Sequence, residues 1–226
     1  MELDQKLGEL KKLMLEMGGY VEKALSLVLD GLLKKDISIL NTVHDVEKNV
    51  NNLQISIDNL CLTILAQQGP VARDLRLILS IIKMNTDLER MGDQCVNMAY
   101  IGRELIERNK LLSKDVQSSV SMVDIQKMSE NVKAMVKLAL DSFVKLDSSV
   151  AENVLKMDDD VDSLRNQVFD KNVKLIKSNT NLTESCLDLI FLARNLERLG
   201  DHATNIAEDV IFANTGRDIR HGVSKV

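Results

Sequence analysis

Aromatic residues and proline are scarce in this chain. Phe, Tyr and Trp together make up 3% of the 226 residues, Trp is absent and proline occurs once. Because β-strands favour aromatic residues and proline interrupts helices, this composition favours helix over strand. Hydrophobic residues still make up 45% of the chain and charged residues 28%, which suits amphipathic helices packed around a core. The composition therefore predicts an all-α protein.

Cysteines, long apolar runs and basic clusters are also scarce. Cys61, Cys95 and Cys186 are widely spaced and odd in number, so we expect buried, reduced thiols and neither a disulfide framework nor a thiolate metal site. No stretch approaches the roughly 18 apolar residues of a membrane span, and the N-terminus lacks the apolar segment of a secretion signal. A cytoplasmic protein is therefore expected. The formal charge is −5 and no cluster of Lys or Arg is long enough to neutralise a row of phosphates, so nucleic acid is not expected as a partner.

Long amphipathic runs, separated by short breaks, predict six helices. Gly69 is expected to cap the second helix, with Pro70 in the first turn of the third. Asn179, Thr180 and Asn181 are expected to form a polar turn before the sixth. The predicted helices span 2–34, 36–68, 70–110, 115–147, 149–179 and 181–213.

A duplicated motif divides the chain into two repeats. Glu89, Gly92, Asp93 and Asn97 recur at a constant offset of 108 residues as Glu197, Gly200, Asp201 and Asn205. Each repeat then holds three helices, the smallest number that buries an apolar stripe on each helix in an up-down-up arrangement. We predict two tandem antiparallel three-helix bundles, residues 1–112 and 113–214, followed by a loose tail at 215–226.

The duplicated motif places two acids one helical turn apart, beside a glycine. Like charges at this spacing repel by a few tenths of a kcal/mol, and glycine costs roughly 1 kcal/mol in a helix interior. Helical periodicity places Glu197 and Asp201 well off the apolar stripe of their helix, near the surface. Helix stability does not explain the motif. We expect the missing glycine side chain to let a neighbouring helix or an ion approach the backbone.

Folding each hairpin predicts which acids lie level with each other. In the second repeat the helices turn at residues 179–180, and two pairs lie at equal distances from this turn, Asp158 with Asp201 and Asp162 with Glu197.

In the first repeat the turn lies near residue 70, and the corresponding pairs are Glu47 with Asp93 and Asn51 with Glu89. Carboxylates brought together repel unless they are protonated or share a cation, and carboxylate oxygens suit Mg²⁺, Mn²⁺, Ca²⁺ or iron. We therefore predict a metal site at each hairpin. Its ligands are Glu47, Glu89 and Asp93 in the first repeat, and Asp158, Asp162, Glu197 and Asp201 in the second.

An ordinary solvated acidic face is the alternative, with Arg90, Arg194 and Arg198 as partners at helical spacing. A single acidic pair would fit that reading. A duplicated pair, with partner positions at equal distances from each turn, favours a metal site instead. His202 points about 100° away from Asp201, so we expect it at the surface and not among the ligands.

The segment QQGPVARDLR, residues 67–76, also allows two readings. Arg73, Asp74 and Arg76 follow the proline at one end of the first bundle. They fit either a helix start with local ion pairs or a recognition surface.

Several motifs taken jointly resemble one known family. The chain carries PVARDLR, DLERMGD and NLERLGDHATNIAEDV after an opening LGELKKLMLEMGGYVEKAL. These segments resemble PhoU, the phosphate-specific transport regulators of bacteria, over nearly the whole chain to about residue 213. The resemblance implies a cytoplasmic, non-enzymatic homodimer whose subunits are built of two three-helix bundles.

The resemblance also implies multinuclear metal clusters on E/D-x-x-x-D motifs. Divalent or trivalent ions are expected, and iron, zinc, manganese, magnesium and calcium all remain open. Asn49 and Asn51 stand where the family often has acids, and Gln94 where it often has histidine. The family motifs fall on Glu89 with Asp93, on Glu197 with Asp201, and on the preceding-helix positions Glu47, Asn51, Asp158 and Asp162.

The function implied by the resemblance is negative regulation of high-affinity phosphate uptake and phosphate-starvation signalling. Such a protein is an adaptor between the importer's ATPase subunit and a membrane sensor histidine kinase, and it reaches the membrane only through these partners. Two alternatives stay open from the residues themselves. One is a metal-dependent phosphate-ester hydrolase that uses the same carboxylates, and the other is a purely structural helical adaptor without metal.

Overall fold

The computed structural model describes residues 2–109 and 120–219, and within these residues it contains helices and no strand. The all-α prediction is therefore confirmed. The order of elements is α1 (Glu2–Lys34), α2 (Ile37–Asn41), α3 (Val43–Gln68), α4 (Ala72–Asn109), α5 (Val120–Lys145), α6 (Ser148–Ser178), the 3₁₀ turn η2 (Thr180–Leu182) and α7 (Thr183–Thr215).

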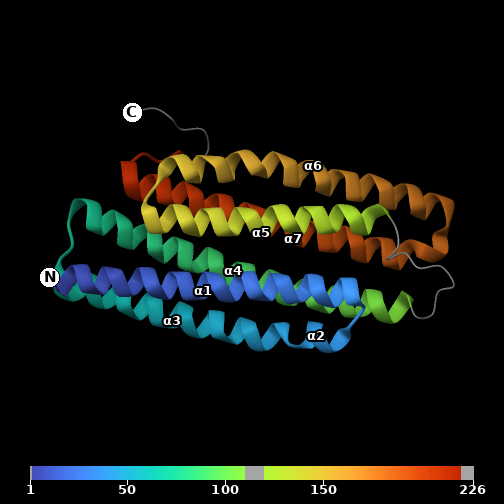
Figure 1. The fold of residues 1–226 in the computed structure, drawn as a ribbon, viewed down its shortest axis with the longest axis horizontal. Coiled ribbons are helices and arrows are strands. Elements are labelled where there is room, and N and C mark those ends of the chain that lie inside the picture. Colours follow the sequence, from blue (N-terminus) through green and yellow to red (C-terminus); the bar gives the residue numbers. More distant parts are fainter. Residues whose placement is uncertain (1, 110–119, 220–226) are drawn as a thin grey trace.

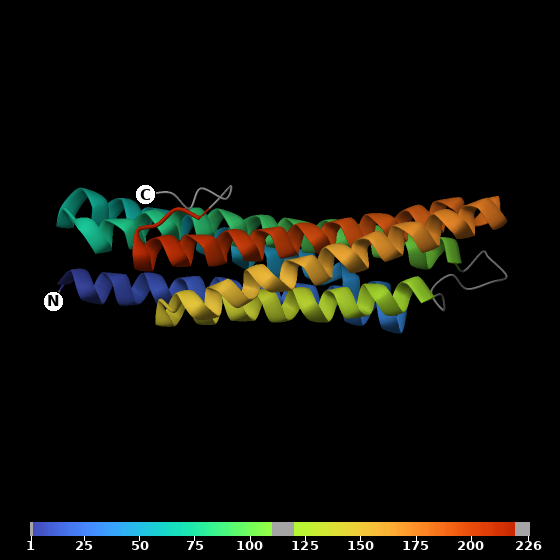
Figure 2. The same ribbon diagram turned by 90° about the horizontal axis from the view of Figure 1, so that it is seen from above.

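Two three-helix bundles lie against each other (Figure 1). Helices α1, α3 and α4 pack together in the first repeat, and α5, α6 and α7 in the second. The most extensive helix pair in the molecule joins the repeats, because α4 packs along α7. Figure 2 shows these two helices in one layer and α1 with α5 in the other. Tandem bundles are thus confirmed, and the repeats share a long seam.

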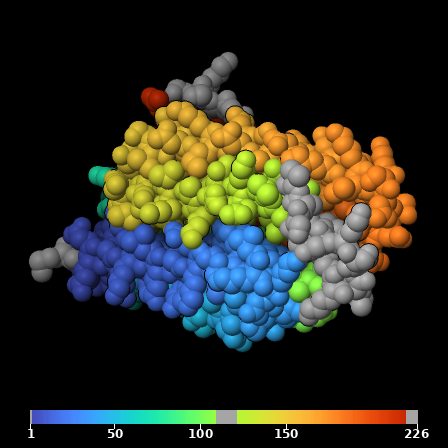
Figure 3. Space-filling model, turned by 45° about the vertical axis from the view of Figure 1, so that its right-hand side comes forward, coloured from blue at the N-terminus to red at the C-terminus, as the bar shows by residue number. Residues whose placement is uncertain are grey.

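The core runs through both repeats without interruption. Its buried apolar side chains come from every long helix and form one contiguous cluster. Met84 and Leu88 of α4 are fully buried, as are Leu199 and Ala203 of α7. Figure 3 shows the two repeats meeting along a continuous line on the outer face, where α1 lies beside α5. The seam between the repeats is therefore packed with side chains and is part of the core.

The second predicted helix and the start of the third differ from the prediction. The second predicted helix is divided at Thr42, whose N–H donates to the carbonyl of Ile39 at 3.0 Å and whose hydroxyl donates to the same oxygen at 2.6 Å. These bonds close α2 after five residues. Pro70 lies outside α4, which begins at Ala72, so its placement in the first turn was wrong. Gly69 caps α3 in the left-handed conformation with φ 53°, as predicted.

The cysteines are placed as predicted, and the last helix ends later than predicted. The three cysteines are free and buried, as expected. Helix α7 ends at Thr215 before Gly216, whose φ is 75°, two residues beyond the predicted end. The boundary predicted at 112/113, the helix start at 115 and most of the tail, 220–226, lie outside the described residues.

Within 2–109 and 120–219, every helix is too short or too polar to cross a bilayer.

Candidate metal centre

The structure brings the four carboxylates of the second hairpin together. Asp158 on α6 is half-buried, and its pKa is raised to about 6 by burial first and then by Asp201, Asp162, Asp159 and Glu197. The pKa of Asp201 is also raised, by burial and then by Glu197 and Asp162. These mutual effects follow from close like charges. Acids at equal distances from the turn therefore lie near each other across the hairpin, as predicted.

Arg165 lies within this cluster and was not anticipated from the sequence. Its Nη2 lies 3.3 Å from Oε1 of Glu197 and 4.0 Å from Oδ1 of Asp162. Its place three residues after Asp162 on the same helical face was the available signal. The guanidinium neutralises part of the acidic charge at the second hairpin.

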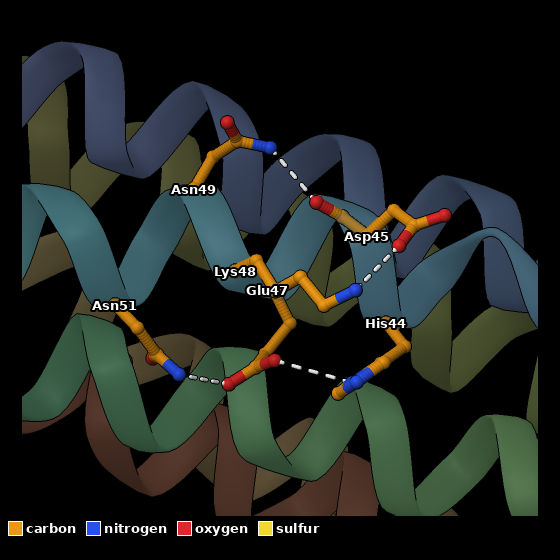
Figure 4. A network of polar contacts seen from close by, with 6 residues as sticks. All are labelled: His44, Asp45, Glu47, Lys48, Asn49 and Asn51. Carbon is orange, nitrogen blue, oxygen red and sulfur yellow. Dashed lines mark hydrogen bonds and ion pairs between the residues drawn. The ribbon is translucent and has the colours of Figure 1, made fainter.

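The first hairpin is built around a buried glutamate. Glu47 on α3 is 6% exposed, and its two carboxylate oxygens contact the Nδ2 of Asn51 and the Nδ1 of His44 (Figure 4). The contact with His44 spans 3.4 Å, and no sequence argument had included His44. In the same view Asn49 turns away and donates to the backbone of Asp45 at 2.8 Å. Asn49 is thus separate from this hairpin's acidic cluster.

The partners of Glu47 on α4 lie close to it. Burial and then Asp93 raise the pKa of Glu89, and Glu47 adds to this increase, while Arg90 and His202 oppose it. Asp93 is exposed and Glu89 half-buried. The structure therefore gathers Glu47, Glu89 and Asp93 as predicted, with one carboxylate fewer than in the second repeat.

The motif glycines lie where α3 and α6 approach their partners. A Cβ on Gly92 would lie 3.3 Å from Cγ1 of Val50, which is a tight contact. A Cβ on Gly200 would lie 3.5 Å from Cγ1 of Val161 and 3.6 Å from Oδ1 of Asp158, which is ordinary contact. Close helix approach is therefore a physical reason for Gly92 and a weaker one for Gly200.

Two tests decide whether the side chains fit a metal: donor chemistry and convergence. Carboxylate oxygens suit hard cations, and the buried Oδ1 of Asn51 has no hydrogen-bond partner among the described residues. The side chains do not converge on one point. In the described segments, no three His, Cys, Asp or Glu side chains are grouped so that they could hold one ion. The donors fit, and binding a cation requires side chains such as Glu197 to turn from Arg165 toward a common point.

A polar clasp joins the two repeats between the hairpins. Oδ1 of Asp87 on α4 lies 2.8 Å from Nδ1 of His202 and accepts a bond from Nδ2 of Asn205 at 3.1 Å, both on α7. The His202 side chain is 15% exposed, so the expectation of a surface histidine was wrong. Helical periodicity gave its direction correctly, but the sequence did not reveal that α4 covers it.

A hollow of about 460 Å³ opens beside the clasp. Lys83 reaches into it, 3.5 Å from Oδ1 of Asp209 and 5.4 Å from the ring centre of Phe212. The hydroxyl of Ser80 donates to the carbonyl of Asp209 at 3.0 Å. Since each of these contacts crosses from α4 to α7, the polar seam holds the repeats in one register.

The PVARDLR segment lies where α4 begins, beside the end of α7. Arg73 is exposed, and Arg76 lies against Gly216 at the end of α7, with its Cζ 3.6 Å from where a Cβ would stand. This contact ties the start of α4 to the end of α7.

Comparison with known sequences agrees with the repeat structure. The PhoU domain family matches residues 14–101 and 125–210. The phosphate-specific transport system accessory protein PhoU homolog of Pseudomonas putida is 33% identical over 220 residues, which are 97% of this chain and 83% of that protein. The protein PhoU of Escherichia coli K12 is 28% identical over 97% of this chain and 88% of its own length.

Solved structures give the same result. The crystal structure of PhoU from Pseudomonas aeruginosa superposes with a TM-score of 0.88 at 33% identity, covering 95% of this chain and 99% of that one. The fold alone is shared with PhoU from Streptococcus pneumoniae, at 24% identity and a TM-score of 0.84. The relatives from Pseudomonas putida and Escherichia coli are named as accessory proteins, which confirms the expectation of a non-enzymatic protein. The chain belongs to the PhoU family.

Proposed function

We propose that this protein is a regulator of high-affinity phosphate uptake that acts as an accessory to the phosphate transport system. The observation that carries the proposal is the match of both repeats to the PhoU domain. It is joined by a relative that is one third identical over 97% of this chain and is named for phosphate-specific transport. A regulator needs surfaces and no substrate cleft. The long exposed helical faces of both repeats suit that requirement.

The finer proposal is a cytoplasmic adaptor. One surface contacts the ATPase subunit of the importer and another contacts a sensor histidine kinase, so that uptake and starvation signalling are damped when phosphate is plentiful. Any such signal must arise from a difference in partner affinity between the phosphate-replete and phosphate-starved states. We further propose that the protein acts as a homodimer.

Metal ions belong to this proposal as structural elements. Glu47, Glu89 and Asp93 would hold the first ion or cluster. Asp158, Asp162, Glu197 and Asp201 would hold the second. A bound cation supplies positive charge that offsets the repulsion among the carboxylates. The protein's own contribution is to bring α3 to α4 and α6 to α7, while Arg165 supplies part of that positive charge from the chain itself.

Metal content tests the structural part of the proposal. Protein purified without chelator or affinity metal is analysed by plasma mass spectrometry beside the double variant Glu197→Ala, Asp201→Ala. More than one equivalent of metal in the wild type and a sharp fall in the variant are expected. The matched control is Glu107→Ala, Glu152→Ala, which removes two exposed acids elsewhere and should leave metal content unchanged. Near-zero metal in all three proteins would refute the metal sites.

Deletion of the gene tests the regulatory part. Expression of phosphate-starvation genes in phosphate-rich medium should rise in the deletion strain and fall again when the wild-type chain is restored. Unchanged expression would contradict negative regulation. Binding of the purified chain to the importer's ATPase subunit and to the kinase's cytoplasmic region, with metal and after chelation, then tests the adaptor.

A further inference from the structure

A second hollow, of about 390 Å³, lies between α6 and α7, away from the seam. Beside the acids Glu197 and Asp201 of the second hairpin, its lining contains arginine and apolar side chains. We call these five residues the arginine groove: Arg165, Phe169, Ile190, Arg194 and Arg198.

The side chains of the groove change character from one helical turn to the next. In the antiparallel pair, Arg165 lies level with Arg194, one turn beyond the acids of the second hairpin. Phe169 lies level with Ile190 a further turn along, four residues or about 6 Å away at 1.5 Å per residue. The groove therefore presents cationic groups and an apolar surface side by side.

The arginines of α7 are available to a ligand. Arg165 is engaged by Glu197, but Arg194 and Arg198 are exposed and form no ion pair within the described part of the chain. A guanidinium presents a planar fork of donors that matches a carboxylate in two parallel hydrogen bonds. Two free forks on one helical face therefore favour an anionic partner group.

The apolar part of the groove is also left uncovered. Phe169 is 49% exposed, and Phe191 and Leu187 on the adjoining face of α7 are 47% and 40% exposed. Two of the chain's four phenylalanines thus face solvent on neighbouring helices. Exposed aromatic side chains next to arginines are the usual composition of the centre of a protein interface.

The first repeat provides an internal comparison. At the same heights between α3 and α4, it has Gln54 for Arg165, Asp58 for Phe169, Thr86 for Arg194 and Arg90 for Arg198. Asp58 is occupied, because its Oδ1 accepts a hydrogen bond from Nδ2 of Asn85 at 2.8 Å. The first repeat folds without counterparts of Arg165, Phe169 and Arg194. The arginine groove is therefore a property of the second repeat and not a requirement of the bundle.

We propose that the arginine groove docks a segment of a partner protein that presents a carboxylate and a bulky apolar side chain about 6 Å apart. This spacing matches positions i and i+4 of a helix, or i and i+2 of a strand. The carboxylate binds Arg194, and the apolar side chain packs on Phe169 and Ile190 one turn away. Arg198 adds positive charge one turn further along α7. Arg194 and Arg198 form no ion pair with the described acids, and these two guanidinium groups are the reason for an acidic segment.

Selection from a library tests the proposal. Random 12-residue peptides displayed on phage are selected against the full wild-type chain in the presence of EDTA. We expect enriched peptides in which Asp or Glu lies two to four residues from Phe, Leu, Met or Trp. An enriched peptide made synthetically should lose at least tenfold in affinity when its acid is changed to the amide, and again when its apolar residue is changed to Ser.

Variants of the chain locate the binding. Phe169→Ser, Arg194→Gln and Arg198→Gln combined should weaken the same peptide at least tenfold. The control in the first repeat combines Leu62→Ser, Thr86→Gln and Arg90→Gln, which are also exposed positions, and should bind as the wild type does. Circular dichroism verifies that both variants are folded.

Other results would overturn the proposal. Failure to enrich any peptide, or equal binding by the groove variant and the wild type, removes the docking site. Displacement of the peptide by millimolar inorganic phosphate, with phosphate itself binding the groove, would make this a small-anion site instead. Loss of self-association in the groove variant alone would assign the groove to a second copy of the chain.

Discussion

At the scale of single residues, Asp158 keeps its proton to an unusually high pH. Burial and then the neighbouring carboxylates, led by Asp201, raise its pKa to about 6 from an ordinary value of 3.8. The folded chain therefore binds this proton more tightly than the unfolded chain does. Between these two pKa values the contribution of Asp158 to stability falls as pH rises, and above pH 6 its charged form is a net cost to the fold.

Asp158→Asn should therefore stabilise the metal-free protein at pH 7 and have little effect at pH 5, where Asp158 is already mostly protonated. Urea unfolding midpoints in EDTA at the two pH values measure this. Asp160→Asn is the control, because Asp160 is exposed and is not among the causes of the shift. An equal change in midpoint at both pH values would contradict the assignment.

The cysteines give a second prediction at this scale. Burial raises the pKa of both Cys61 and Cys95 to about 12, and raises that of Cys186 as well. Since the thiolate is the reactive form, none of the three should react with Ellman's reagent within minutes in the native protein. All three should react at once in 8 M urea. Rapid release of one equivalent from the native protein would show that a thiol is accessible.

Single-residue roles were predicted well where periodicity decides them and poorly where neighbours do. The heights of Asp158 and Glu197 follow from the position of one turn, so they could be predicted. The burial of His202 depends on which helix covers the seam, and the position of Arg165 depends on a contact across the hairpin. The 3.6-residue period of a helix fixes the direction of a side chain and not what it meets.

At the scale of helices, the long elements could be predicted because their apolar stripes repeat over many turns. The break at Thr42 could not, because it depends on two hydrogen bonds to one carbonyl, that of Ile39, rather than on a change in composition. Pro70 is compatible with either the first helical turn or the linker before it, because the φ angle that its ring fixes suits both positions.

Two glycines of α1 provide a prediction about helix packing. A Cβ on Gly31 would lie 2.5 Å from Cδ2 and 2.6 Å from Cγ of Leu40 on α2, so Gly31→Ala should destabilise the protein by about 1–3 kcal/mol through overpacking. Gly19 has no atom within 4 Å of a Cβ, and Gly19→Ala should stabilise by about 0.5–1 kcal/mol through helix propensity. Urea unfolding of both variants measures the contrast. Similar effects of both substitutions would mean that α2 yields to the methyl group.

At the scale of the whole molecule, the repeats should unfold together. The core is continuous across them, and Asp87 bonds to both His202 and Asn205 across the seam. Asp87→Ala should therefore lower the free energy of unfolding by about 1.5–3 kcal/mol while leaving a single cooperative transition. Denaturation followed by circular dichroism tests both points.

Thr86→Ala is the control for Asp87→Ala. Thr86 is the exposed neighbour of Asp87 on α4, and its hydroxyl bonds only within its own helix, to Ile82 at 3.3 Å. Its effect should stay within about 0.5 kcal/mol, as for most surface substitutions. Two separate transitions in the wild type would show that the repeats are energetically independent.

The clasp also limits the ways in which the protein can change shape. Sliding α4 along α7 by one helical turn, roughly 5.4 Å, would part Asp87 from His202 and carry Ser80 away from the carbonyl of Asp209. Packed helices move by such shear only if an alternative set of contacts is available. Rotation of each hairpin about the seam keeps these bonds. A conformational signal that passes between the repeats should therefore travel as a hinge motion, with the seam as its axis.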